Sequence, residues 1–335
     1  MSFEMRRGTN VSHWLSQSSV RGERRRAYFT RSDVEYLAGL GLDHLRFPID
    51  EEQMWDEAGR AEEEAFDLLN AALDWCAEFG LRAIIDVHIL RGHHFNVEVK
   101  PLWTDEAVQE GFYDCWRQLS ARLGTRPRDM VAYELLNEAV ADDPDEWNRV
   151  AHGAIAAIRE LEPQRIIVLG SNQWNSADSF DRLSVPEDKN LILTFHFYLP
   201  FLLTHHTASW TPLAPYKGPV HYPGRVVEEA ELEALDDAGR ELIKELTGVH
   251  NREVLEGLMA KPLAVAERTG LPLYCGEWGC IKAAPEPDRL RWYADVRSIL
   301  EEHSIAWATW DYKGSGFGLA PNGTPDEGLI RVLTS

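Results

Sequence analysis

The sequence predicts an α/β fold of the (β/α)8 TIM-barrel class. Eight short apolar segments alternate with amphipathic helical segments along the 335 residues. The apolar segments lack a polar face, as is typical of a parallel sheet covered by helices. The first segment is followed by no GxGxxG turn, which disfavours an open dinucleotide-binding sheet. A barrel of this kind needs about 250 residues, so the excess is expected in loops.

The expected strands are apolar runs bounded by polar or glycine residues. They lie at 8–14, 43–49, 81–90, 130–137, 165–170, 190–198, 271–278 and 305–312.

The expected helices lie between these strands. Segment 62–80 repeats apolar residues at helical spacing and ends at Gly80, a natural terminator. Pro144 and Pro287 mark two further helix starts. The remaining pattern predicts helices at 104–123, 144–161, 253–270 and 287–303. No strong helix is expected between the fifth and sixth strands, and only a short one after the eighth.

We expect residues 1–335 to form a single catalytic domain with a long insertion at about 199–252. The first part, 199–225, is rich in proline and aromatic residues and predicts a long ordered loop. The second part begins at 228 as an acidic helix, whose charged face is expected to lie in solvent.

The net charge of -21 disfavours nucleic acid and anionic membranes as partners, because both attract positive surfaces. No apolar run approaches the roughly 18 residues of a membrane span. The N-terminus, MSFEMRRGTN, lacks the apolar core of a secretory signal. We therefore expect a cytoplasmic protein, or a secreted one whose signal has been removed. No sequence feature indicates an oligomeric state.

Polar and aromatic residues gather where the predicted strands end. Barrel enzymes place their active sites at the carboxyl ends of the strands. The residues at these ends are Arg46, Asp86, His88, Asn137, Glu138, His196, Tyr198, Glu277, Trp278, Trp310 and Asp311.

Glu138 and Glu277 are the candidate catalytic pair, because the fourth and seventh strands lie roughly opposite each other. A retaining glycosidase needs two carboxylates about 5–5.5 Å apart, one protonated and one ionised. Arg46 and Tyr198 can stabilise the ionised form of Glu277. The negative charge of Glu277 would then raise the affinity of Glu138 for its proton.

Four tryptophans are candidate platforms for sugar rings, whose C–H faces stack on flat aromatic surfaces. Each lies at a predicted strand end or in a rim loop: Trp14, Trp174, Trp210 and Trp310. The alternative is that they fill the core, as large aromatic residues often do.

The chain resembles glycoside hydrolase family 5, the retaining (β/α)8 enzymes that include many cellulases and mannanases. The resemblance rests on motifs in order over about residues 8–312: GTNVSHW, LRFPI, IIDVHIL, LLNEAV, FHFY, YCGEWG and WATWDYKG. It implies that Glu138 is the acid/base and Glu277 the nucleophile. It also implies that Asn137 contacts the sugar 2-hydroxyl and that Arg46 and Tyr198 orient the nucleophile.

The resemblance further places His88 and His196 beside the cleaved bond, with Trp310 beneath its sugar. We expect no cofactor and no metal. Adjacent histidines point apart on an extended chain, so the pairs 93–94 and 205–206 do not predict a metal site.

The substrate is left open by the motifs. We favour β-1,4-linked glucan or cello-oligosaccharides, with a β-mannan enzyme (mannanase or mannosidase) and an exo-acting β-glucosidase as alternatives. A loop blocking one end of the cleft, such as 199–225, would favour exo action. Two alternatives from other classes are a metal-dependent barrel hydrolase and a carbohydrate-binding protein without catalysis.

Overall fold

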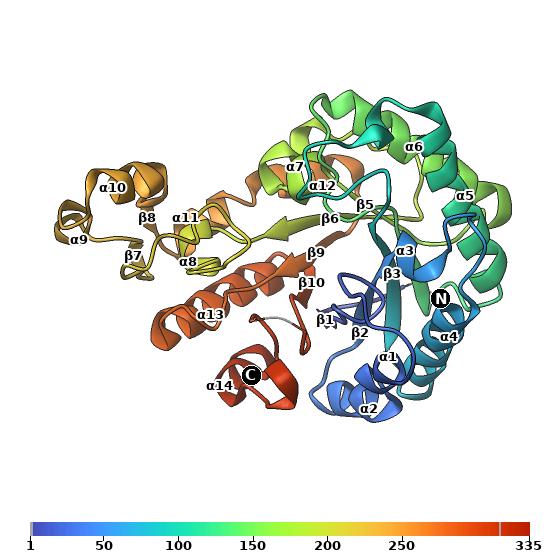
Figure 1. The fold of residues 1–335 in the computed structure, drawn as a ribbon, viewed down its shortest axis with the longest axis horizontal. Helices are drawn as coiled ribbons and strands as arrows, with labels where there is room; N and C mark the ends of the chain where they lie inside the picture. The colour runs from blue at the N-terminus through green and yellow to red at the C-terminus, as the bar shows by residue number, and fades with distance from the viewer. Residues whose placement is uncertain (1–2, 315) are drawn as a thin grey trace.

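The computed structural model describes residues 3–314 and 316–335 and confirms the predicted (β/α)8 barrel. Eight parallel strands close in the order β1-β10-β9-β6-β5-β4-β3-β2 (Figure 1). They are β1 (Arg7–Asn10), β2 (His44–Asp50), β3 (Arg82–Ile89), β4 (Val131–Glu134), β5 (Ile167–Gly170), β6 (Leu191–Phe197), β9 (Leu273–Trp278) and β10 (Ala306–Thr309).

Helices surround the barrel and connect its strands (Figure 1). Those outside the segment between β6 and β9 are α1 (Glu23–Tyr28), α2 (Arg31–Gly39), α3 (Glu51–Met54), α4 (Glu63–Glu78), η1 (Pro101–Trp103), α5 (Glu106–Leu123), α6 (Pro144–Leu161), α7 (Asn172–Asn175), η2 (Ala177–Arg182), α13 (Glu286–Glu302), η4 (Pro321–Gly323) and α14 (Glu327–Thr334). As predicted, only short elements lie between β5 and β6, and the last helix is short.

The barrel interior changes from apolar to polar along the strands. One apolar cluster includes Ile84, Ala132, Val168, Ile192, Tyr274, Ala306 and Ala308. Side chains that share a face recur every second residue of a strand. The next inward positions on β3, β4 and β6 are therefore Asp86, Glu134 and Thr194, and all three are buried. An apolar floor thus supports a polar layer near the carboxyl end of the barrel.

The segment between β6 and β9 is much longer than the other connections. It contains α8 (Phe201–Thr204), β7 (Gly224–Arg225), α9 (Glu229–Glu233), α10 (Asp237–Ile243), η3 (Lys244–Leu246), β8 (Val249–His250), α11 (Arg252–Gly257) and α12 (Ala260–Thr269). β7 and β8 form a small antiparallel sheet, and together with α9 and α10 they project from the barrel (Figure 1).

Hydrogen bonds hold this segment against the barrel. The Tyr222 hydroxyl donates to Asp295 of α13 at 2.7 Å, and Trp292 Nε1 donates to the Leu199 carbonyl at 2.9 Å. The Ile281 amide donates to the Thr204 carbonyl at 2.9 Å. The residues that follow β6 are thereby fixed beside the carboxyl ends of β6 and β9.

Two segments that were each predicted as one continuous helix are interrupted in the structure. The expected helix 253–270 is divided into α11 and α12, because Pro262 has no N–H to donate to the Leu258 carbonyl. The expected acidic helix is divided into α9, α10 and η3. Asp236 accepts a hydrogen bond from the Gly239 amide and so caps the start of α10.

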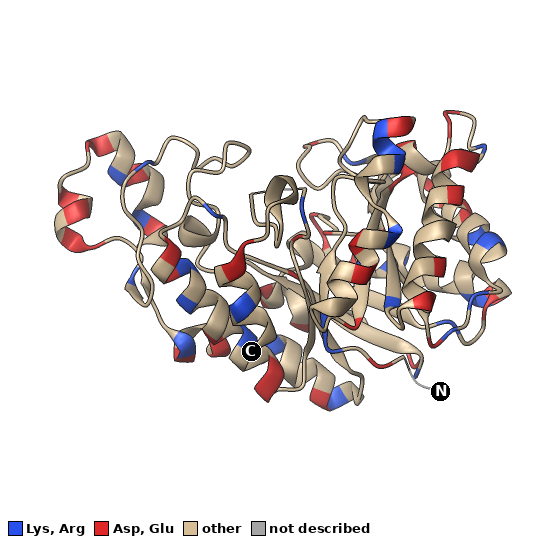
Figure 2. Ribbon diagram, turned by 90° about the horizontal axis from the view of Figure 1, so that it is seen from below, with Lys and Arg blue, Asp and Glu red and all other residues tan. Residues whose placement is uncertain are grey.

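Charged residues lie mainly on the outer helices. Acidic residues gather on the projecting α9 and α10 (Figure 2), and α9 has no buried residue, which confirms the predicted solvent-exposed face. Within the described ranges, the helices are all too short or too polar to cross a membrane.

A glycine in β1 is required by the packing of the barrel floor. A Cβ on Gly8 would lie 2.4 Å from the ring of His44, which is fully buried. We expect Gly8→Ala to lower the free energy of unfolding by about 1–3 kcal/mol, as overpacking does. Urea unfolding followed by circular dichroism measures this change.

The matched control is Gly111→Ala in α5, where an added Cβ meets no atom within 4 Å. Alanine favours a helix over glycine by about 0.8–1.0 kcal/mol, so this variant should be more stable than the parent. Equal effects at the two positions would contradict the packing explanation.

Candidate active site

The carboxyl ends of six strands bring the predicted polar residues to one rim. Arg46 lies in β2, His88 in β3, His196 in β6 and Glu277 in β9. Asn137 and Glu138 follow β4, Tyr198 follows β6 and Trp310 follows β10. Residues separated by up to 231 positions in the chain are in hydrogen-bond contact here.

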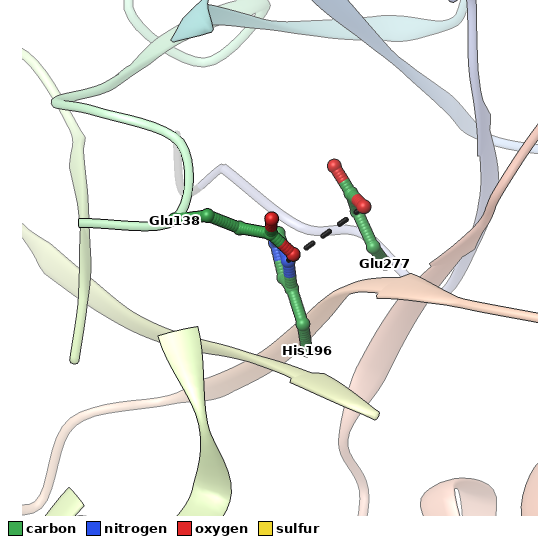
Figure 3. Close-up of side chains that lie close together, drawn as sticks. All are labelled: Glu138, His196 and Glu277. Atoms are coloured by element: carbon green, nitrogen blue, oxygen red, sulfur yellow. Dashed lines mark hydrogen bonds and ion pairs between the residues drawn. The ribbon is translucent and has the colours of Figure 1, made fainter. Parts of the chain in front are cut away.

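Glu138 and Glu277 approach each other, and the side chain of His196 lies near both carboxylates (Figure 3). One carboxylate oxygen of each glutamate and one ring nitrogen of His196 all lie within 4.8 Å of one another. His196 Nδ1 is 3.0 Å from Glu138 Oε1 and 3.6 Å from Glu277 Oε2. Two oxygens of the pair are thus close enough for the about 5–5.5 Å carboxylate separation of retaining glycosidases.

Glu277 is surrounded by groups that stabilise its ionised form. Arg46 Nη1 donates to Oε1 at 2.7 Å, and the Tyr198 hydroxyl donates to Oε2 at 2.9 Å. The pKa of Glu277 is raised on balance by burial, and the positive charge of Arg46 and the hydrogen bond from Tyr198 oppose this rise. Each oxygen of this carboxylate therefore has a donor of its own.

Glu138 receives neither of these two hydrogen bonds. Burial and the nearby negative charge of Glu277 hold its pKa well above the usual range. It is hydrogen-bonded to His196, a ring that burial keeps neutral by lowering its pKa. The proton shared by the two glutamates is therefore favoured on Glu138.

The backbone at Glu138 has φ +44°, in the left-handed region that non-glycine residues seldom adopt. Such conformations cluster at functional sites. Asn137, beside it, accepts from Arg46 Nη2 at 3.0 Å, while its buried Nδ2 has no hydrogen-bond partner among the described residues. An amide donor thus lies beside the carboxylate pair.

Three further residues hold Arg46: Asp86 is among the strand-end residues expected from the sequence, whereas Glu134 and Asn10 are not. Glu134 accepts from Nε and Nη2 at 2.7 and 3.0 Å, Asn10 accepts from Nη1 at 2.8 Å, and Asp86 lies 3.1 Å from Nη2. The sequence does indicate a role for Glu134, because a charged residue inside an apolar strand is seldom buried without a partner.

His88 and Trp310 pack against each other near the carboxyl ends of β3 and β10. Their rings are stacked, 5.5 Å apart and 4° from parallel. His88 Nδ1 lies 2.7 Å from Asp86 Oδ2, and burial lowers the pKa of His88 to about 3. A neutral ring that donates from Nδ1 presents Nε2 as an acceptor. The role of Trp310 as a sugar platform stays a prediction.

The other three tryptophans differ in position. Trp14 is only 1% exposed, packs on Phe29 and Phe47, and donates to the Arg25 carbonyl, so its prediction as a sugar platform is wrong. The reason is that β1 ends at Asn10, so Trp14 belongs to the segment after the strand and its side chain packs into the core. Trp174 and Trp210 are 47% and 57% exposed, and their contact with sugar stays a prediction.

Glu138, His196 and Glu277 are also the one group of the described residues whose donor atoms could surround a metal ion. Arg46 and Tyr198 already bind the two oxygens of Glu277. A guanidinium 2.7 Å from the carboxylate opposes a second cation at the same ligand. The donor set therefore fits a carboxylate pair for acid–base and nucleophilic chemistry better than a metal centre.

A family model, Cellulase (glycosyl hydrolase family 5), matches residues 9–316. The chain belongs to glycosyl hydrolase family 5. This membership confirms the resemblance found in the sequence and shows that the protein is a glycoside hydrolase, an enzyme that binds carbohydrate.

Among curated relatives in this family, Endoglucanase C of Acetivibrio thermocellus is 33% identical over 316 residues, covering 92% of each chain. Cellodextrinase A of Ruminococcus flavefaciens is 29% identical and covers 90% of this chain and 83% of its own. The crystal structure of endoglucanase Cel5A from Thermotoga maritima has a TM-score of 0.78 at 23% identity, with 98% and 96% coverage. The last likeness supports the fold.

Truncating Trp14 and Trp310 separately should distinguish their roles in this family 5 enzyme. We expect Trp14→Ala to lower the free energy of unfolding by about 3–5 kcal/mol, since a large core side chain is lost. Its KM on a soluble β-glycan should be unchanged below the new Tm.

Trp310→Ala should instead raise KM about ten-fold, corresponding to about 1.4 kcal/mol of lost ring stacking. Thermal unfolding and steady-state kinetics measure both effects. A raised KM for Trp14→Ala, with normal KM for Trp310→Ala, would reverse the assignment.

Proposed function

We propose that this family 5 enzyme hydrolyses β-1,4-linked glucan or cello-oligosaccharides with retention of anomeric configuration. The observation that carries the proposal is the pair Glu138 and Glu277, whose carboxylates share one cluster but have different surroundings. One is held by Arg46 and Tyr198, and the other has neither contact.

In the first step, Glu277 attacks the anomeric carbon while Glu138 donates its proton to the glycosidic oxygen. The bond to the leaving sugar breaks, and an ester forms between Glu277 and the remaining glycosyl unit. Arg46 and Tyr198 keep the attacking carboxylate ionised and oriented before the reaction.

In the second step, Glu138 acts as the base. Esterification removes the negative charge of Glu277, which is one of the causes of the raised pKa of Glu138. The pKa of Glu138 then falls, so its carboxylate can accept a proton from water. That water attacks the anomeric carbon, the ester bond breaks, and Glu277 is regenerated as a carboxylate.

The substrate part of the proposal draws on the relatives. Endoglucanase C and Cellodextrinase A both carry names that refer to glucan or cellodextrin. Trp310, whose ring is stacked on that of His88, would offer its remaining surface to the flat C–H face of an equatorial pyranose. Asn137 Nδ2 and His88 Nε2 supply a donor and an acceptor for sugar hydroxyls.

Removing either carboxylate should affect a different step. Glu277→Ala should lose at least about 10³-fold in kcat, because the covalent intermediate cannot form. Azide should restore turnover by occupying the space of the lost carboxylate, giving a glycosyl azide of inverted configuration. Glu138→Gln should be impaired most on substrates with poor leaving groups, since it cannot donate a proton.

The stereochemistry is read by NMR of the first product formed by the parent enzyme. Retention is expected, and inversion would contradict the nucleophile assignment. Activity should also survive EDTA; activity lost to EDTA and restored by one divalent metal would favour a metal-dependent hydrolase instead.

A panel of soluble β-1,4-glucan, β-mannan, xylan and aryl β-glycosides tests the sugar. We expect the highest kcat/KM on glucan or cello-oligosaccharides, with products of several lengths. A preference for mannan would favour a mannanase or mannosidase. Release of single glucose units from chain ends would favour an exo-β-glucosidase.

A further inference from the structure

Glu134 is a buried carboxylate that the two-step reaction does not use. It is the last residue of β4 and is only 1% exposed, inside the barrel beneath the catalytic pair. Both of its oxygens bind Arg46, through Nε at 2.7 Å and Nη2 at 3.0 Å. Planar two-point pairing of this kind fixes the orientation of a guanidinium as well as its position.

The five N–H donors of Arg46 are all engaged. Besides the two bonds to Glu134, Nη1 donates to Asn10 and Glu277, and Nη2 donates to Asn137. The bonds to Asn10 and Asn137 are single contacts with neutral amides. Glu134 is therefore the partner that sets the plane of the guanidinium, and Glu277 receives the donor that this plane directs toward it.

Charge makes a second link between Glu134 and the nucleophile. Arg46 faces Glu134, Asp86 and Glu277, and burial removes the screening by water. Other titratable groups facing this cluster are Tyr274 from β9, His88 from β3, and Glu138, His196 and Tyr198 above it. Because one guanidinium serves three carboxylates, removing the charge of Glu134 leaves more of the positive charge of Arg46 for Glu277.

We propose that Glu134 is a positioning residue for the glycosidase reaction: it orients Arg46 toward Glu277 and moderates the stabilisation that Arg46 gives to the nucleophile. Too strong a stabilisation of the carboxylate makes it a weaker nucleophile. The inference rests on the proposed role of Glu277. It adds a residue that touches neither the sugar nor the reacting atoms.

The test compares pH profiles of kcat/KM for the parent enzyme and Glu134→Gln, using an aryl β-cellobioside. The acid limb reports ionisation of Glu277, and the basic limb reports loss of the proton from Glu138. In Glu134→Gln, one negative charge beside Arg46 is lost, so Glu277 and Glu138 experience more of the positive charge of the guanidinium. Both limbs should therefore move to lower pH, by about one unit, and kcat at the optimum should fall about 10²-fold because the guanidinium is displaced. KM should change less than kcat.

Glu134→Asp separates charge from shape. It keeps the carboxylate but withdraws it by one methylene, so the limbs should stay near those of the parent enzyme while kcat remains reduced. If Glu134→Gln does not fold, this variant decides the question. Parent-like kcat in Glu134→Asp would overturn the proposal.

Asp326→Asn is the matched control for losing a carboxylate from a buried arginine. Asp326 binds Arg289 at 2.8 Å, both side chains are buried, and among the described residues neither is hydrogen-bonded or ion-paired to Arg46, Glu138 or Glu277. We expect a lower Tm and unmoved limbs. Limbs that move equally in Asp326→Asn and Glu134→Gln would overturn the proposal, because a general loss of stability would explain them.

Tyr198→Phe distinguishes this inference from the proposed function. The hydroxyl lowers the pKa of Glu277 by donating to it, so its removal should move the acid limb to higher pH. If Tyr198→Phe moves the limb and Glu134→Gln does not, the role of Glu134 is overturned and that of Glu277 stands. If neither variant moves it, the limb does not belong to Glu277 and both proposals fail.

Discussion

The buried guanidinium of Arg46 is the interaction on which the active site depends. An arginine inside a barrel loses its hydration, and the energetic cost is large unless its donors and charge are matched. Here all five donors are used, and three carboxylates surround the charge. The same bonds join β1, β2, β3, β4 and β9 across the barrel interior. The contacts that stabilise the polar layer are thus the same contacts that orient Glu277.

This arrangement explains why two glutamates of the same chemical type can take different roles. Glu277 is buried and the side chain of Glu138 is 13% exposed, and burial by itself would raise both pKa values. Arg46 and Tyr198 contact Glu277 and not Glu138, so the symmetry between the two carboxylates is broken. The negative charge of Glu277 then favours the proton on Glu138. Loss of that charge in a covalent intermediate would allow Glu138 to release its proton. A single set of contacts supports both halves of the proposed reaction.

The long segment between β6 and β9 contributes to the site through its first residues. Tyr198 lies at its start, and hydrogen bonds from Ile281 and Trp292 fix the following turn. The projecting α9 and α10 are acidic (Figure 2), and α9 has no buried residue. The part of the insertion that contacts Glu277 is therefore its first segment, which is hydrogen-bonded to the barrel.

Much of this protein was determined by the sequence alone, because the relevant signals are local. Strand and helix periodicity gave the barrel, and barrel geometry placed Glu138 and Glu277 at one rim. Local pattern could not settle where a helix breaks at Pro262 or Asp236, nor that β1 ends before Trp14. It also did not identify Glu134 and Asn10 as partners of Arg46. Those contacts join residues 36 to 88 positions apart, and only the closed barrel brings their side chains into one desolvated layer where each charge requires a partner.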